Sequence, residues 1–173
     1  RHKPLTAMTR RSGHEAPKAP IRLALYQPDI AQNTGAILRV AACLGIPVDI
    51  IEPCGFPISA RGLKRAGLDY LDLATYAIAS GWEAFLSDSE QRGQRLVLLS
   101  TRAEMSCFDF AFAAGDTLLL GQETAGVPPE VHHRADARIR IPMIQAARSL
   151  NVAVAGAIAA TEALRQLGAL PNP

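Results

Sequence analysis

The chain has 173 residues, of which 49% are hydrophobic, and its 18 lysines and arginines nearly balance its 16 aspartates and glutamates. A soluble domain of this length buries roughly 70% of its unfolded surface, so it needs neither disulfides nor a structural metal ion. The three cysteines lie far apart without a CxxC pair, and no apolar run approaches the roughly 18 residues of a membrane-spanning helix. These features argue against a disulfide framework, a metal site, membrane insertion and secretion, and they favour the cytoplasm.

The net charge of +2 is unevenly distributed along the chain. Residues 1–20 carry five basic side chains and one acidic side chain, whereas residues 21–173 carry a net charge of −2. Three prolines and the absence of any apolar periodicity predict that residues 1–20 form a flexible basic tail before a single domain over 21–173. The tail is either an arm that adds salt-dependent affinity for nucleic acid or a leader partly derived from an expression vector.

From residue 21 onward, short apolar runs alternate with helical patterns. In chain order we predict a strand at 21–27, a helix at 33–45, a strand at 48–52, helices at 59–66 and 81–91, strands at 95–100, 117–121 and 138–141, and a long helix at 149–167. This alternation is typical of a three-layer α/β domain with a mostly parallel sheet. The sequence contains no GxGxxG, GxxxxGK[ST], GxSxG or HExxH motif, which argues against NAD, ATP, serine-hydrolase and zinc-protease chemistry.

Polar loops follow three of the predicted strands, at the sheet edge where open α/β folds bind ligands. In the first loop, Asn33 is a candidate helix N-cap and Gly35 permits close backbone approach. Arg39 lies one helical turn beyond the glycine. A capped helix with a solvent-exposed arginine explains this spacing equally well.

The second and third loops carry further polar residues. Gly121 and Gly126 bracket Glu123 after an apolar strand, and a following proline is suited to open a short helix. In the third loop, the last helix is predicted to begin at or near Ser149, with Asn151 in its first turn. Most residues of that helix are small, which favours close packing on a sheet or on a second subunit.

Together these loops resemble the three motifs of the SPOUT class of RNA 2′-O-methyltransferases. The resemblance runs from residue 21 to about residue 168 and rests on NTGAILR (33–39), IIEPCGF (50–56), RAGLDY (65–70), GQETAGVP (121–128), IPM (141–143) and RSLN (148–151). IIEPCGF and RAGLDY are most similar to the bacterial tRNA 2′-O-methyltransferases that act on cytidine or uridine 34, the wobble nucleotide.

The resemblance implies a C-terminal trefoil knot and S-adenosyl-L-methionine as cofactor. Its binding residues would be Leu99, Ser100, Thr101, Gly121, Glu123, Gly126, Ile141, Met143, Ser149 and Leu150. Arg39, Ser149 and Asn151 would be catalytic, with Arg39 either deprotonating the ribose 2′-hydroxyl or gripping the adjacent phosphate and stabilising the alkoxide. We favour the second role because a guanidinium group normally stays protonated. The resemblance also implies a homodimer with its active site at the subunit interface.

The predicted RNA contacts are Arg148 and a basic face made of Arg61, Lys64 and Arg65, whose spacing places all three on one side of a short helix. The expected partner is tRNA, and we expect no binding to DNA or to a membrane. The alternative for the basic face is a solvated helix surface without a ligand. Trp82 and Tyr76 either stack on bases or, as we expect, pack in the core. Alternative functions are 2′-O-methylation of another tRNA or rRNA ribose, or binding of RNA or S-adenosylmethionine without catalysis.

Overall fold

Seven strands form one sheet in the computed structural model, which describes residues 9–11, 19–65 and 70–172. The strands are β1 (Thr9–Arg11), β2 (Arg22–Tyr26), β3 (Val48–Ile51), β4 (Tyr76–Ala79), β5 (Arg95–Leu99), β6 (Asp116–Leu120) and β7 (Ala137–Ile139). Their order across the sheet is β1-β4-β3-β2-β6-β5-β7, and every neighbouring pair is parallel except β1 with β4. The predicted mostly parallel sheet is therefore confirmed.

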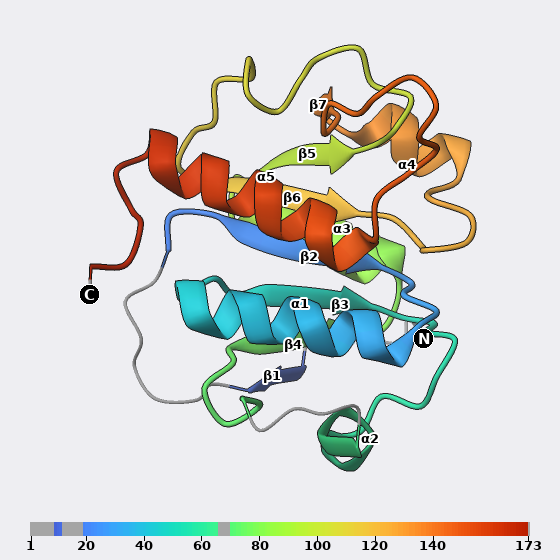
Figure 1. The fold of residues 1–173 in the computed structure, drawn as a ribbon. Coiled ribbons are helices and arrows are strands. Elements are labelled where there is room, and N and C mark those ends of the chain that lie inside the picture. Colours follow the sequence, from blue (N-terminus) through green and yellow to red (C-terminus); the bar gives the residue numbers. More distant parts are fainter. Residues whose placement is uncertain (1–8, 12–18, 66–69, 173) are drawn as a thin grey trace.

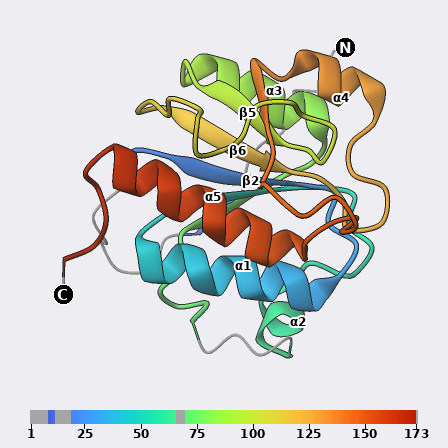
Figure 2. The same cartoon turned by 45° about the horizontal axis from the view of Figure 1, so that its top comes forward.

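Helices cover both faces of the sheet and complete the predicted three layers (Figure 1). They are α1 (Ala31–Leu44), α2 (Ala60–Arg65), α3 (Trp82–Gln91), α4 (Pro129–Arg134) and α5 (Val152–Gln166). The long helices α1 and α5 lie side by side on one face, α3 and α4 lie on the other, and α2 stands apart beyond β4 (Figures 1 and 2).

The two faces of the sheet have separate apolar cores because side chains alternate along each strand. In the central strand β6, Leu118 and Leu120 join the core beneath α1 and α5, whereas Leu119 joins the core beneath α3 and α4. A Cβ atom added to Gly156 of α5 would lie 2.8 Å from Leu120 Cδ1, so α5 packs closely against the sheet. Close packing on the sheet therefore explains Gly156 of this helix.

After β7 the chain passes between two other segments. The Ser100 amide donates to the Ile139 carbonyl at 2.9 Å. On the far side, the Arg140 amide donates to Met105 and the Cys107 amide donates to Arg140, both at 2.9 Å. The segment that leads to α5 is therefore flanked by the end of β5 and by the β5–β6 connection. The trefoil knot itself stays a prediction from the resemblance.

The structure differs from the sequence analysis at several element ends. Helix α1 starts earlier than predicted, with Ile30 as N-cap, so Asn33 does not cap it and lies in its first turn. Helix α5 starts later, with Asn151 as its N-cap, so Ser149 belongs to the preceding loop. Strand β4 was not predicted. Residues 1–20 were predicted to form a flexible tail, yet Thr9–Arg11 form edge strand β1. The other tail residues before Ala19, and residues 66–69 of RAGLDY, lie outside the described part of the chain.

Candidate active site

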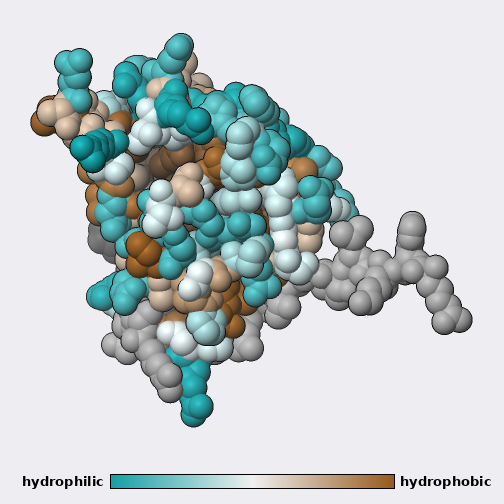
Figure 3. All heavy atoms as spheres, turned by 90° about the vertical axis from the view of Figure 1, so that its right-hand side faces the viewer, coloured by the Kyte–Doolittle hydropathy of each residue, from teal (hydrophilic) through white to brown (hydrophobic). Residues whose placement is uncertain are grey.

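A pocket of about 1190 Å³ lies where the parallel strands end. The loops after β2, β5, β6 and β7 line it, together with the beginnings of α1 and α5. Figure 3 faces this side of the molecule and shows apolar side chains in a recess bordered by hydrophilic ones. The pocket therefore occupies the predicted ligand-binding edge of the sheet.

All ten residues predicted to bind a cofactor line this pocket. They come from three loops: Leu99, Ser100 and Thr101; Gly121, Glu123 and Gly126; and Ile141, Met143, Ser149 and Leu150. The pocket also contains Asn33 and Asn151. Apolar side chains and closely spaced backbone groups thus share one cavity, a lining suited to a flat heterocycle with polar edges.

The loop after β6 is tightly closed. The Gln122 amide donates to the Gly126 carbonyl at 2.8 Å, and the Gly126 amide donates back to the Gln122 carbonyl at 3.0 Å. A Cβ atom on Gly121 would lie 2.7 Å from the Gly126 carbonyl carbon, and Gly126 has a φ of +66°. Both glycines are therefore required by the backbone, which explains why they bracket Glu123 in the sequence.

A carboxylate pair ties this loop to the loop after β2. The Asp29 amide donates to Glu123 Oε2 at 3.0 Å, and the Glu123 amide donates to Asp29 Oδ1 at 3.1 Å. Thr124 Oγ1 also donates to Asp29. Burial raises the pKa of Glu123, whereas the hydrogen bonds made by Glu123 and Thr124 lower the pKa of Asp29. Glu123 therefore holds the two loops together through Asp29, a residue that was not predicted to belong to the site.

Asn151 joins the starts of the two long helices. Its Oδ1 accepts hydrogen bonds from the Ala153 and Val154 amides at 2.9 and 3.3 Å, and its Nδ2 donates to Asn33 Oδ1 at 2.9 Å. The Oδ1 atom of Asn151 is therefore engaged in capping α5, and one of its two Nδ2 hydrogens is engaged by Asn33. By contrast, the exposed Ser149 makes no hydrogen bond with any described residue, so its hydroxyl is available to a ligand.

Arg39 does not line the pocket of its own chain. It lies on the exposed side of α1, with its guanidinium carbon 4.6 Å from the centre of the Tyr70 ring. The structure therefore brings Ser149 and Asn151 together but leaves Arg39 outside this group. The stacking on Tyr70 gives the guanidinium a defined position, and no carboxylate among the described residues pairs with it.

The predicted RNA contacts fall in two places. Arg61 is exposed on α2, and the side chains of Lys64 and Arg65 on the same helix lie outside the described part of the structure. Arg148 is exposed in the β7–α5 loop, where it lines a small cavity with Thr101 and Arg140. Tyr76 and Trp82 pack within the protein, as expected: Tyr76 is buried, and Trp82 contacts Tyr26 and Phe85.

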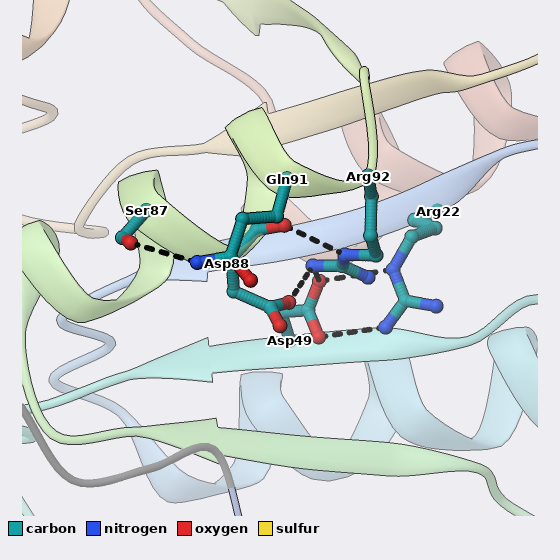
Figure 4. A network of polar contacts seen from close by, with 6 residues as sticks. All are labelled: Arg22, Asp49, Ser87, Asp88, Gln91 and Arg92. Atoms are coloured by element: carbon teal, nitrogen blue, oxygen red, sulfur yellow. Dashed lines mark hydrogen bonds and ion pairs between the residues drawn. The ribbon is translucent and has the colours of Figure 1, made fainter.

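A buried ion-pair network lies at the other end of the strands (Figure 4). Asp49, with no exposed side-chain surface, accepts hydrogen bonds from Arg22 at 3.0 and 2.7 Å and from Arg92 at 3.2 Å. Arg92 also pairs with Asp88 at 2.6 Å. The network joins β2, β3 and the end of α3, so its role is structural.

Within the described ranges, no cluster of histidine, cysteine and carboxylate side chains is placed to hold a metal ion. None of the helices described above has the length and apolar character that crossing a lipid bilayer requires. Burial and the carboxylates of Glu52 and Glu123 raise the pKa of Cys54 to about 12, so its thiol is a poor nucleophile.

Comparison with known proteins yields closely similar sequences. The model of the SpoU rRNA Methylase family matches residues 20–161. The tRNA (cytidine(34)-2′-O)-methyltransferase of Ancylobacter novellus is 53% identical over 148 residues, which cover 86% of this chain and 94% of that protein. The enzyme of the same name from Beijerinckia indica is 55% identical over 148 residues, covering 86% and 92%.

Two solved structures extend the comparison. A structure described as giving insights into the 2-OH methylation of C/U34 on tRNA has a TM-score of 0.80 and 45% identity, covering 86% of this chain and 96% of that chain. An AdoMet-bound rRNA methyltransferase from Sinorhizobium meliloti has a TM-score of 0.76 and 28% identity, covering 85% and 56%. Because the family model spans most of the chain and two relatives share more than half of the aligned residues, the chain belongs to the SpoU rRNA Methylase family.

Proposed function

We propose that this protein transfers a methyl group from S-adenosylmethionine to the ribose 2′-hydroxyl of nucleotide 34 in tRNA. One observation carries the proposal: the pocket gathers the ten residues predicted to bind the cofactor, Ser149 among them, together with Asn151. The names of the relatives, which share 53% and 55% of the aligned residues, support the choice of nucleotide. A tRNA-modifying role also supports the cytoplasm as the compartment.

The pocket fits S-adenosylmethionine by its shape and by the kind of groups that line it. The Gly126 backbone occupies the space in which a Gly121 Cβ atom would lie, so the loop after β6 keeps one compact shape beside the ligand. The side chains of Leu99, Ile141 and Leu150 would cover the adenine faces. When bound, the cofactor supplies an activated methyl group on a sulfonium, so the protein mainly needs to align the hydroxyl.

Ser149 and Asn151 have different roles in this proposal. Asn151 is a positioning residue, because its Oδ1 caps α5 and its Nδ2 holds Asn33. It thereby fixes the end of the loop that carries Ser149. The free Ser149 hydroxyl hydrogen-bonds the ribose 2′-hydroxyl and orients its lone pair toward the methyl group.

Arg39 acts across a subunit interface in this proposal, as part of a homodimer. Its position outside the pocket of its own chain supports an action on the pocket of a second copy. Exposed apolar side chains at the starts of α1 and α5, Ile30 and Val154, support burial of this region by a partner. Arg39 would bind the phosphate next to the target ribose and stabilise the developing alkoxide. Light scattering that shows only an 18.5 kDa particle at micromolar concentration would contradict the dimer.

Transfer of labelled methyl groups to tRNA tests the proposed function. Unmodified tRNA is expected to accept about one methyl group per molecule, whereas a matched tRNA with a 2′-deoxy nucleotide 34 accepts none. Equal labelling of both tRNAs would place the methyl group elsewhere. Binding of S-adenosylmethionine without transfer to tRNA or rRNA would indicate a non-catalytic binding module.

A further inference from the structure

The arginines of the described chain fall into groups that differ in their partners. Five of them, Arg22, Arg92, Arg95, Arg134 and Arg165, each form an ion pair with a carboxylate. Arg102, Arg140 and Arg148 are exposed and form none with any described residue. All three lie on the loops after β5 and β7, at one side of the pocket. Their charges are therefore not neutralised within the described chain.

These three arginines surround two adjoining cavities. Arg102 lines the large pocket, Arg148 lines a smaller cavity of about 170 Å³, and Arg140 lines both. The two cavities also share residues Thr101, Ile141 and Met143, so they adjoin at Arg140. No carboxylate lines the smaller cavity, whose other polar side chains are those of Thr101 and Gln145. This cavity is therefore positively charged.

The backbone holds two of the arginines in defined positions. The Arg140 amide and carbonyl are both hydrogen-bonded, to Met105 and Cys107, at 2.9 Å. The Arg102 amide donates to Ser100 Oγ at 3.2 Å within the turn after β5. Since the backbone is already ordered, binding an anion costs only the freedom of the side chains. A guanidinium group presents paired N–H donors that match two oxygens of a phosphodiester.

We propose that Arg102, Arg140 and Arg148 form a phosphodiester-binding subsite that holds the RNA backbone beside the methylated nucleotide. This inference deepens the proposed function and rests on it for the identity of the RNA. Arg102 and Arg140 are new in this role, since the sequence analysis selected only Arg148 from this region. The subsite lies next to the residues that line the cofactor pocket, so a phosphate bound there would fix the position of the neighbouring ribose.

Binding of unmodified tRNA to the variants Arg102→Gln, Arg140→Gln and Arg148→Gln tests the subsite. Each variant is expected to bind tRNA about tenfold more weakly, because a charge-assisted hydrogen bond is lost. Each should also reduce the slope of log Kd against log salt concentration by about 0.7, as for one lost phosphate contact on a single strand. Arg165→Gln is the matched control, since it removes the same charge at the far end of α5 and should leave both values unchanged.

Three results separate the possible errors. An unchanged salt slope in all three variants would overturn the subsite. Weaker binding of S-adenosylmethionine with unchanged binding of tRNA would show that the arginines hold the carboxylate of the cofactor, which would also overturn it. If the wild-type protein binds tRNA but transfers no methyl group, the proposed function fails, and the same titrations still decide the subsite. Side chains this exposed are not required for folding, and circular dichroism of each variant confirms that point.

Discussion

Substitution of Gly121 by alanine should damage the cofactor pocket without unfolding the domain. The added Cβ atom would lie 2.7 Å from the Gly126 carbonyl carbon, about 0.7 Å closer than ordinary van der Waals contact at 3.4 Å. The clash is with backbone, so no side chain can rotate away from it. Relief therefore requires the Gln122–Gly126 closure, with hydrogen bonds of 2.8 and 3.0 Å, to open.

Loss of these two hydrogen bonds costs about 2 kcal/mol, at about 1 kcal/mol each. If this cost opposes the binding-competent loop, S-adenosylmethionine should bind roughly thirtyfold more weakly. Isothermal titration calorimetry measures this change directly. The matched control is Gly81→Ala, because no atom lies within 4 Å of a Cβ atom built there. Cofactor affinity equal to wild type in Gly121→Ala would refute the assignment of this loop to the pocket.

The remaining predictions concern stability and the helix starts. Asp49→Asn should lower the free energy of unfolding by about 2–3 kcal/mol, because the substitution weakens a buried ion network whose arginines reach solvent. Urea denaturation measures this loss, with the exposed Asp72→Asn as control. An unchanged denaturation midpoint for Asp49→Asn would contradict the prediction. Hydrogen bonds from Arg165 and Gln166 lower the pKa of Glu162 from 4.5 to about 2, so its stabilising effect is complete above pH 4.5 and disappears as the pH falls toward 2. Melting temperatures across this range should decline less for Glu162→Gln than for wild type, and parallel curves would refute this pKa shift. Asn151→Ala should lower the free energy of unfolding by about 1 kcal/mol through loss of the α5 N-cap, and it should also reduce methyl transfer. Asn151→Asp keeps the cap. Equal melting temperatures of the two variants would disprove the capping role.

Much of the fold could be predicted because the central strands are apolar on both faces. β5 and β6 are interior strands of a parallel sheet that lies between two helical layers. Both of their faces are therefore buried, and their sequences are mostly apolar runs. Strand β4 was missed because it has only four residues, two of them alanine. Edge strand β1 depends on antiparallel pairing with β4, a contact across more than 60 residues that no local pattern carries.

The site could be predicted as a set of loops but not as a set of contacts. Cofactor residues lie at strand ends, and parallel strands place those ends at one edge, so the ten predicted positions share a pocket. The Asp29 pairing with Glu123 spans 94 positions and could not be read from either loop. Asn33 was predicted to cap α1, yet it instead accepts a hydrogen bond from the cap of α5. Long-range partners decide the role of each polar side chain here.

The central claim is methylation of nucleotide 34 in tRNA, and mapping the methylated ribose in cellular tRNA tests it most directly. The tRNA would be isolated from cells that contain the protein, from cells that lack it, and from cells that contain only an Arg39→Lys variant. Nucleotide 34 would then be analysed by nuclease digestion and mass spectrometry. The account predicts a 2′-O-methyl group at position 34 that is absent without the protein and strongly reduced with Arg39→Lys, whose binding of S-adenosylmethionine stays intact. Full methylation at position 34 in cells that lack the protein, or near wild-type methylation with Arg39→Lys, would contradict the account.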